Sequence, residues 1–418
     1  MSGERRPPTV PIAVLAKNGL AGLAALADEL GPVFALENGP VIVTGYADGS
    51  ALSDRRFVSH IGGQLAALRP VLGDGLATAA TDSPAWHRGH DVLVPAFSPQ
   101  RLARTVPAFE AAAANLAQLW NSGGDHDVAT DVMRTSLDGI ARALAGVEWR
   151  GEWADIPKVL HRSVIAAKEK RPVAESDLRV LRAFTDALVA EHQCSSDDAE
   201  DFLDQLLTGR TPEGEMLSPD EVHFQLLTLL VAGHETTGSL ISFCIYELLV
   251  NPEVRAELQN HVRDVATGMP IDSAMLASVP LLEQVVRESL RLHSPAIALT
   301  LTPLEAVTLP SGVDVVPGDE VLVLVDSVHR DAVWSDANRF DPSRFSADRR
   351  AEIPRNGWIP FGFGPRTCIG RNLAMLHAAT TLAVLLRDCD IQPADDHYVM
   401  KLSEGLTPLP EGLLVRGV

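Results

Sequence analysis

One long apolar segment near the middle of the chain limits the possible folds more than any other feature. Residues 219–250 read PDEVHFQLLTLLVAGHETTGSLISFCIYELLV, with no proline after the first position. Ser218 before Pro219, with Glu221 three residues on, predicts a helix N-terminus with a capping box. Asn251 and Pro252 predict its end. The sequence therefore predicts one helix of about thirty residues, roughly 45 Å long.

A helix that is apolar on every side either crosses a bilayer or runs through a large core. At its centre lie His234, Glu235, Thr236 and Thr237, and charged groups are costly in mid-bilayer. We therefore expect the central helix of a large soluble core and no membrane span.

Composition agrees with a soluble globular chain. Of 418 residues, 46% are apolar and 22% are charged, and the formal net charge of -20 argues against nucleic-acid binding. The four cysteines show no paired spacing, so neither a disulfide framework nor a zinc site is indicated, and a cytoplasmic location is expected. The N-terminal stretch does not read as a signal peptide. No repeat or low-complexity linker divides the chain, so we expect a single domain over 1–418.

The remaining segments favour a mainly α fold with a minor β portion. Residues 102–145 and 281–292 have helical composition, and Pro295 ends the second of these helices. Residues 39–46 look like an early strand, whereas residues 306–325 alternate and turn like a small antiparallel sheet.

A cysteine stands in a glycine-rich stretch, FGFGPRTCIG, at residues 361–370. Glycines allow the tight turn that a metal-binding thiolate needs, and the helical stretch after it favours an anion at its N-terminus. On these residues alone, an ordinary buried cysteine is an equally good interpretation of Cys368.

Three other patterns are each ambiguous alone. In AGHETT (232–237), Thr236 could bond back to the preceding turn while Glu235 finds an ion-pair partner, or the two could deliver protons at a helix distortion facing a ligand. ESLR (288–291) places an acid and an arginine three apart on one helix face. FDPSRF (340–345) contributes an arginine in a non-helical stretch.

Together, in this order and spacing, the four patterns resemble the cytochrome P450 family, the haem-thiolate monooxygenases. Residues 361–370 fit the family's Phe-x-x-Gly-x-Arg-x-Cys-x-Gly signature at every fixed position. The resemblance runs from about Leu23 to Val418. It implies the cytochrome P450 fold, a mainly α domain with a small antiparallel β portion, and haem b (iron protoporphyrin IX) as cofactor.

The resemblance also implies a role for each matching residue. Cys368 would be the thiolate ligand of the haem iron, with Arg366 on a propionate, Phe361 against the sulfur side of the ring, and Gly370 completing the signature. Glu288, Arg291 and Arg344 would form the structural Glu-Arg-Arg cluster that holds the cysteine loop. Glu235 and Thr236 would be the catalytic acid–alcohol pair.

Trp86 and His90 replace the His-x-x-x-Arg that many bacterial members carry. This pattern, with GDGLAT and HRDAVW, looks more like the haem domain of reductase-fused fatty-acid hydroxylases. Trp86 would donate its indole N–H to a propionate, and His90 would also lie in the haem site. The arginine that many members use for the other propionate is missing, and its replacement stays open.

The expected substrate pocket contains Ala77, Ala232, Ile42 and Tyr46. Relatives in this branch often carry phenylalanine where this chain has Ala77, and a basic carboxylate anchor at the channel mouth where it has Ile42. Both differences favour a bulkier and less anionic substrate than a fatty acid. Variable segments near 60–80 and 155–200 are expected to determine the substrate.

The resemblance therefore predicts a monooxygenase that uses O2 to hydroxylate or epoxidise a small molecule, in a secondary-metabolite tailoring step. Because no flavin segment follows EGLLVRGV, we expect a separate ferredoxin and ferredoxin reductase as electron donors. A fatty-acid hydroxylase, a peroxide-using peroxygenase and a non-catalytic haem sensor or recognition domain are the alternatives. The acid–alcohol pair weighs against the last two.

Overall fold

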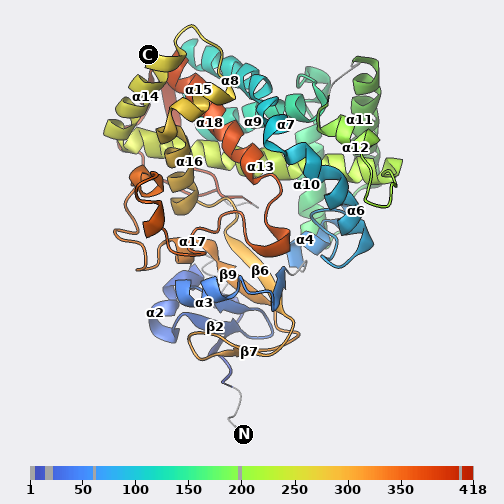
Figure 1. Cartoon of the computed structure of the whole chain (residues 1–418), viewed down its shortest axis with the longest axis vertical. Helices are drawn as coiled ribbons and strands as arrows, with labels where there is room; N and C mark the ends of the chain where they lie inside the picture. The colour runs from blue at the N-terminus through green and yellow to red at the C-terminus, as the bar shows by residue number, and fades with distance from the viewer. Residues whose placement is uncertain (1–4, 15–21, 60–62, 196–199, 404–406, 418) are drawn as a thin grey trace. The chain divides into compact units, whose positions relative to one another are not determined.

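The computed structural model describes residues 5–14, 22–59, 63–195, 200–403 and 407–417 (Figure 1). Parts of the N-terminal stretch and of both variable segments discussed above lie outside these residues. The described residues form two compact units, one made of the chain up to residue 59 with 287–368, the other of 63–286 with 369–417. A single domain over the whole chain stays a prediction.

The first unit is built on a mixed sheet whose strand order is β1-β2-β3-β9-β6-β4. The pairs β1–β2 and β3–β9 are parallel, and the other three are antiparallel. The strands are β1 (Thr9–Val10), β2 (Val33–Leu36), β3 (Val41–Val43), β4 (Phe57–Ser59), β6 (Ala298–Pro303) and β9 (Val321–Leu324). Short helices and turns complete this unit: α2 (Ala27–Leu30), α3 (Tyr46–Ala51), α17 (Val325–His329), η3 (Pro342–Phe345), η4 (Arg350–Glu352) and η5 (Gly364–Arg366).

The small sheet predicted over 306–325 forms only in part. Strands β7 (Val307–Thr308) and β8 (Asp314–Val315) pair as an antiparallel ribbon. Strand β9 instead joins the six-stranded sheet, parallel to β3. The side chains of Val321, Val323 and Leu324 are buried on both faces of β9, which suits a central strand better than a half-exposed hairpin.

The second unit is mainly helical. Its helices are α4 (Gly63–Ala67), α5 (Arg69–Leu72), α6 (Pro84–Leu93), η1 (Val94–Phe97), α7 (Pro99–Ala103), α8 (Val106–Asn121), α9 (Val128–Ala145), η2 (Gly151–Trp153), α10 (Ile156–Lys168), α11 (Glu175–Ser195), α12 (Phe202–Thr208), α13 (Pro219–Val250), α14 (Pro252–Ala266), α15 (Ser273–Ser278) and α18 (Arg371–Asp388). Helix α16 (Pro280–Leu292) runs across the border between the units. Strands β10 (Ile391–Pro393), β11 (Leu414–Gly417) and β5 (His126–Asp127) form a small antiparallel sheet.

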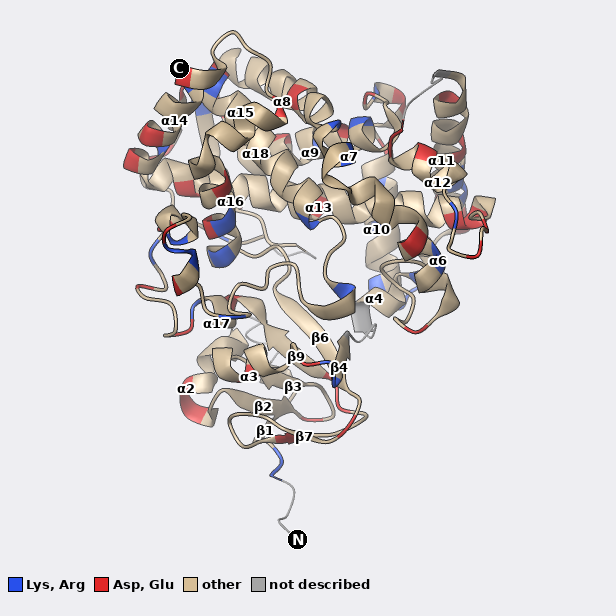
Figure 2. Ribbon diagram, viewed as in Figure 1, with Lys and Arg blue, Asp and Glu red and all other residues tan. Residues whose placement is uncertain are grey.

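Helix α13 is the predicted central helix. It packs against α9 and α18, and α8 packs against the same two helices. The predicted capping box is confirmed, since the N–H of Glu221 donates to Ser218 Oγ (3.3 Å) and the N–H of Ser218 donates to a Glu221 carboxylate oxygen (2.7 Å). Charged residues are sparse along α13 and α18 and more frequent on α14 (Figure 2). Among the described helices, none is both long enough and apolar enough to span a bilayer.

The helical run predicted over 102–145 is divided. Helix α8 ends at Asn121, and α9 begins only at Val128. Gly123 and Gly124 between them have φ values of 89° and 95°, in the left-handed region that glycine adopts without steric cost. The paired glycines therefore turn the chain, and the Asp127 side chain then caps α9 by accepting the N–H of Thr130.

A buried histidine lies where α8, α9 and α18 meet. The ring of His377 stacks on Phe109 with centroids 3.9 Å apart and planes 8° apart. Neither ring nitrogen has a hydrogen-bond partner in the described part of the chain. A Cβ at Gly139 would come within 2.7 Å of His377 Nε2, so the imidazole packs directly on the α9 backbone. Burial lowers the pKa of His377 to about 3.

We predict that His377→Leu weakens the pH dependence of stability. The folded pKa lies below the ordinary value near 6.5, so the unfolded chain binds the extra proton, and stability is lost as pH falls from 6.5 toward 3. One such group contributes about 1.4 kcal/mol per pH unit in that window. Urea unfolding at pH 7 and pH 5 should therefore show a smaller acid loss in the variant, by about 2 kcal/mol. Parallel losses in both proteins would contradict this, and between pH 7 and pH 8 their difference should stay constant.

Candidate functional site

The loop that carries Cys368 closes on itself. The backbone N–H of Cys368 donates to the carbonyl of Phe361 (2.9 Å). Gly362 and Gly364 have φ values of 71° and 73°, and a Cβ at either would clash with nothing. The left-handed backbone, and not lack of space, therefore calls for glycine at both positions. The turn leaves Cys368 exposed, and this contradicts the interpretation of an ordinary buried cysteine.

Two further side chains of this loop suit a porphyrin with carboxylates. Burial lowers the pKa of Arg366 to about 10, and an adjacent carboxylate would offset that loss of hydration. The Phe361 ring lies partly exposed, edge-on to Trp358 with centroids 6.0 Å apart. The exposed thiol suits the iron of haem b, and the partly desolvated guanidinium and the aromatic ring on the same loop suit its propionates and its porphyrin ring. Gly370 caps the N-terminus of α18.

The three predicted cluster residues contact one another inside the first unit. Arg291 forms a two-pronged ion pair with Glu288, at 2.7 and 2.8 Å, and both side chains have no exposed surface. Arg344 approaches the same carboxylate from the other side, with Nε 3.2 Å from a Glu288 oxygen. The backbone N–H of Asp341 donates to that oxygen as well (2.9 Å).

Every N–H of Arg291 has an acceptor. Besides the two bonds to Glu288, its guanidinium donates to the carbonyls of His329 (2.9 Å), Ala337 (2.6 Å) and Arg339 (3.1 Å). A buried charge is tolerated only when it is paired and fully hydrogen-bonded. The cluster therefore fixes the chain between residues 329 and 344. Its role in holding the cysteine loop stays a prediction.

Sequence reasoning missed His329, which connects the cluster to the segment before the cysteine loop. Its Nδ1 lies 3.0 Å from the carbonyl of Arg291, and its Nε2 accepts the N–H of Ile359 at 2.8 Å. Nδ1 therefore carries the proton of a neutral ring. Burial lowers the pKa of His329 to about 3, which keeps the ring neutral. His329 is the first residue of the HRDAVW stretch, which points to a branch of the family but does not by itself show this bridging role.

The acid–alcohol pair lies at the centre of α13, which stays α-helical throughout. Thr236 bonds back to the preceding turn, with Oγ1 donating to the carbonyl of Ala232 (2.6 Å). Among the described residues, Glu235 makes no hydrogen bond or ion pair. Ala232 is exposed although most of α13 is buried, so the helix leaves room for another group beside Ala232 and Thr236. No helix distortion accompanies the pair.

Helix α6 carries Trp86 and His90. The two rings stack with centroids 4.5 Å apart, and Trp86 is buried. Ser83 caps the helix by accepting the N–H of Trp86 (3.2 Å). Ala77 lies partly exposed in the loop before this helix. The structure thus places Trp86, His90 and Ala77 in the same unit as Glu235 and Thr236.

The structure places Ile42 and Tyr46 differently from the expected channel mouth. Ile42 is fully buried in a cluster of the first unit with Phe34, Leu23 and Leu324. An arginine there would be an unpaired buried charge, so Ile42→Arg would disturb this core instead of creating a carboxylate anchor. The hydroxyl of Tyr46 is already used, because it donates to the carbonyl of Arg355 (2.9 Å).

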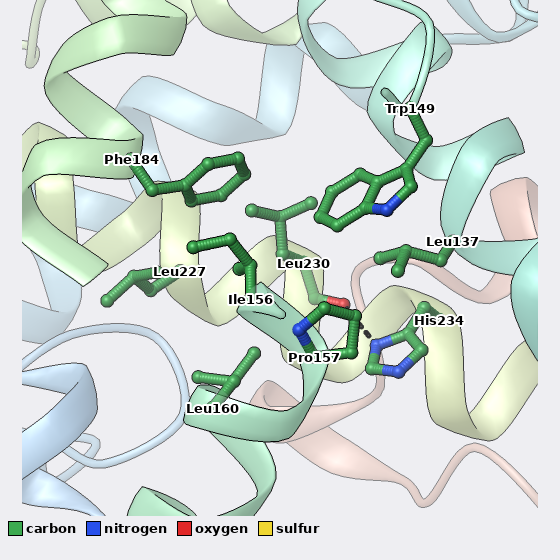
Figure 3. A pocket seen from close by; sticks show the side chains of 9 residues that line it. All are labelled: Leu137, Trp149, Ile156, Pro157, Leu160, Phe184, Leu227, Leu230 and His234. Carbon is green, nitrogen blue, oxygen red and sulfur yellow. Dashed lines mark hydrogen bonds between the residues drawn. The ribbon is translucent and has the colours of Figure 1, made fainter. Parts of the chain in front are cut away.

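A small apolar pocket in the second unit is separate from the acid–alcohol pair. Its lining comes from the α9–α11 region and from α13 (Figure 3): Leu137, Trp149, Ile156, Pro157, Leu160, Phe184, Leu227, Leu230 and His234. His234 lies two residues from both Ala232 and Thr236, about 200° around the helix. The pocket therefore occupies the opposite side of α13, and His234 Nδ1 is used on the carbonyl of Leu230 (3.0 Å).

We predict that Arg291→Lys destabilises the protein severely. An ammonium cannot replace five fixed donors, so it leaves Glu288 underpaired in the core, a change that costs about 3–5 kcal/mol. The matched control is Arg349→Lys, which loosens a partly exposed pair with Asp341 and should cost under about 1 kcal/mol. Unfolding midpoints in urea measure both, and equal small losses would show that the cluster adds little stability.

Comparisons with known proteins identify relatives of this chain. A self-sufficient cytochrome P450 monooxygenase of Aspergillus terreus, CYP505E3, is 32% identical over 96% of this chain and 41% of its own length. A bifunctional cytochrome P450/NADPH–P450 reductase of Fusarium oxysporum is 31% identical over 94% of this chain and 40% of its own. The chain thus spans about two fifths of the length of these relatives.

These names overturn one expectation from the sequence. A separate ferredoxin with its reductase was predicted because no flavin segment follows the haem domain. The relatives are named as self-sufficient or as fused to an NADPH–P450 reductase, so this partner prediction is wrong. It relied on where the sequence stops, which carries no information about electron supply.

The family itself follows from a broader match. The model of the family described as cytochrome P450 matches residues 153–415, well over half of the chain. That range includes the acid–alcohol pair, the Glu288 cluster and the cysteine loop. The α-rich fold with small sheets, and haem b as the cofactor, are those of this family. The chain belongs to the cytochrome P450 family.

Proposed function

We propose that this chain is a haem-thiolate monooxygenase domain in which Cys368 binds the iron. The observation that carries the proposal is the exposed thiol of Cys368 on a loop shaped by left-handed glycines. When bound, thiolate-ligated haem supplies the activation of O2. Arg366 and the indole N–H of Trp86 would hold propionates, and Phe361 would pack against the porphyrin.

Thr236 and Glu235 bind water and pass protons to it. The Thr236 hydroxyl donates its hydrogen to the carbonyl of Ala232. Its oxygen can therefore accept a hydrogen bond from a water molecule. Glu235 is partly exposed and unpaired among the described residues, so it can exchange protons with that water. The pair thus holds and supplies water-borne protons beside the exposed Ala232.

The substrate is a small organic molecule, and Ala77 favours one that is broader than an unbranched fatty acid. The methyl group of Ala77 leaves space that a phenyl ring would fill. A tailoring step on a bulky secondary metabolite suits this pocket. A fatty-acid hydroxylase is the second candidate, because the family branch indicated by Trp86 and His90 contains such enzymes.

Electrons come from an NADPH–P450 reductase, as the names of the relatives indicate. An inserted oxygen atom and a molecule of water together consume one O2, two electrons and two protons. The proton-supplying pair is needed for this balance, whereas a haem sensor would not need it.

Thr236→Ala tests the proposed reaction, with Thr237→Ala as the matched control. Thr237 is adjacent but buried. With NADPH, an NADPH–P450 reductase and a substrate found by its haem spin shift, Thr236→Ala should form about 10²-fold less product per NADPH, within the usual range for proton transfer. It should release peroxide instead, while Thr237→Ala should stay coupled.

Three results would count against the proposal. Equal coupling in both variants would remove Thr236 from the mechanism. Product formed only with added hydrogen peroxide would indicate a peroxygenase. Ligand binding without product under any electron supply would indicate a sensor.

A further inference from the structure

A buried glutamine on α13 lies against the loop that carries Ala77. Gln225 is 2% exposed in a helix that is otherwise mostly apolar. Its carboxamide oxygen lies 3.4 Å from the backbone N–H of Leu76, the residue before Ala77. The acid–alcohol pair does not use this side chain, and no pattern in the sequence singled it out.

The carboxamide occupies a slot between two glycines from different elements. A Cβ added at Gly75, in the loop, would come within 2.8 Å of Gln225 Nε2. A Cβ at Gly89, on α6, would come within 2.3 Å of the same nitrogen. Neither glycine has a positive φ, so the close approach of the Gln225 carboxamide, and not backbone conformation, favours glycine at both positions. Gln225 therefore touches both the Ala77 loop and the helix that carries Trp86.

The loop also carries hydrogen bonds of its own. Thr78 is buried, and its hydroxyl both donates to the carbonyl of Gly73 and accepts the N–H of Gly75 (3.2 Å). Arg69 donates twice to the carbonyl of Thr78, at 3.0 and 3.3 Å. These hydrogen bonds tie the loop together, and Gln225 is one place where it rests on α13.

Gln225, Ala232 and Thr236 share one face of α13. Thr236 follows Gln225 by eleven residues and Ala232 follows it by seven, each within about 20° of the same helical direction. The distance from Gln225 to Thr236 along the axis is roughly 16 Å. The slot thus anchors the Ala77 loop on the side of the helix where Ala232 is exposed.

We propose that Gln225 is a positioning residue that sets the Ala77 loop and thereby the size of ligand admitted beside α13. This inference rests on the proposed function, which places Ala77 beside the bound ligand. The slot of Gln225, Gly75 and Gly89 is independent of it, so two measurements address the slot and a third addresses the ligand.

The first two measurements need no ligand and use Gln205→Ala as the matched control. Gln205 is another buried glutamine, whose amide donates to the carbonyl of Val92 at the end of α6 (2.8 Å) and does not contact the Ala77 loop. Gln225→Ala should speed hydrogen exchange of the Leu76 amide about threefold to tenfold, as loss of one hydrogen bond does, and Gln205→Ala should not.

The second measurement is a double-mutant comparison of stability. Gly89→Ala should lower the unfolding midpoint of the parent protein, and it should lower that of the Gln225→Ala variant much less.

The third measurement uses two haem ligands of different size, imidazole and 4-phenylimidazole, titrated by absorbance. Gln225→Ala should change the ratio of their dissociation constants about threefold to tenfold. The Gln205→Ala ratio should equal that of the parent. The inference is overturned if Gln225→Ala leaves three quantities unchanged: the ratio of dissociation constants, the exchange rate of the Leu76 amide, and the effect of Gly89→Ala on the unfolding midpoint. If the parent binds neither probe, the proposed function fails, while exchange and coupling still decide whether the slot exists.

Discussion

The buried two-pronged ion pair between Arg291 and Glu288 is the interaction on which the first unit depends. Both charges are removed from water, so each must be compensated, and Arg291 achieves this with five donors. Three of those bonds end on backbone carbonyls between residues 329 and 339. Leaving Arg291 unpaired would cost free energy, so the irregular stretch from residue 329 to 339 folds with three of its carbonyls pointing at this side chain.

From this cluster a series of hydrogen bonds between neutral groups continues toward Cys368, and its role in holding the cysteine loop stays a prediction. Arg291 binds the backbone of His329 and also accepts from its ring, and the ring holds the N–H of Ile359. Two residues further on, Phe361 accepts the N–H of Cys368. A series of directional hydrogen bonds therefore links the buried charge to the backbone of Cys368, and Ile359 along it also packs in an apolar cluster of the first unit.

Much of this was predictable where the signal is local. The capping box and the apolar run define α13, and the glycines around Cys368 define its turn. The split between α8 and α9 also had a local cause, the paired Gly123 and Gly124, which the helical composition around them obscured. The sheet containing β9 was not predictable, because its partner strand β3 lies about 280 residues earlier in the chain.

The site shows the same division. Cys368, Glu288 and Thr236 stand in spaced patterns, whereas His329 and Gln225 are single polar residues whose roles depend on distant backbone. Gln225 meets Leu76 across 149 positions, and no periodicity marks such a contact. Ile42 shows the converse error, since a position matched to a channel-mouth residue lies in a closed apolar cluster.

The most direct test of this account is the absorbance of the ferrous carbon monoxide complex in Cys368→His and Cys194→Ser. Cys194 is the other exposed cysteine among the described residues and serves as the control. If Cys368 supplies the thiolate, the parent and Cys194→Ser show the red-shifted band of a thiolate ligand, and Cys368→His shows the shorter-wavelength band of a nitrogen ligand. A red-shifted band that persists in Cys368→His would contradict the account.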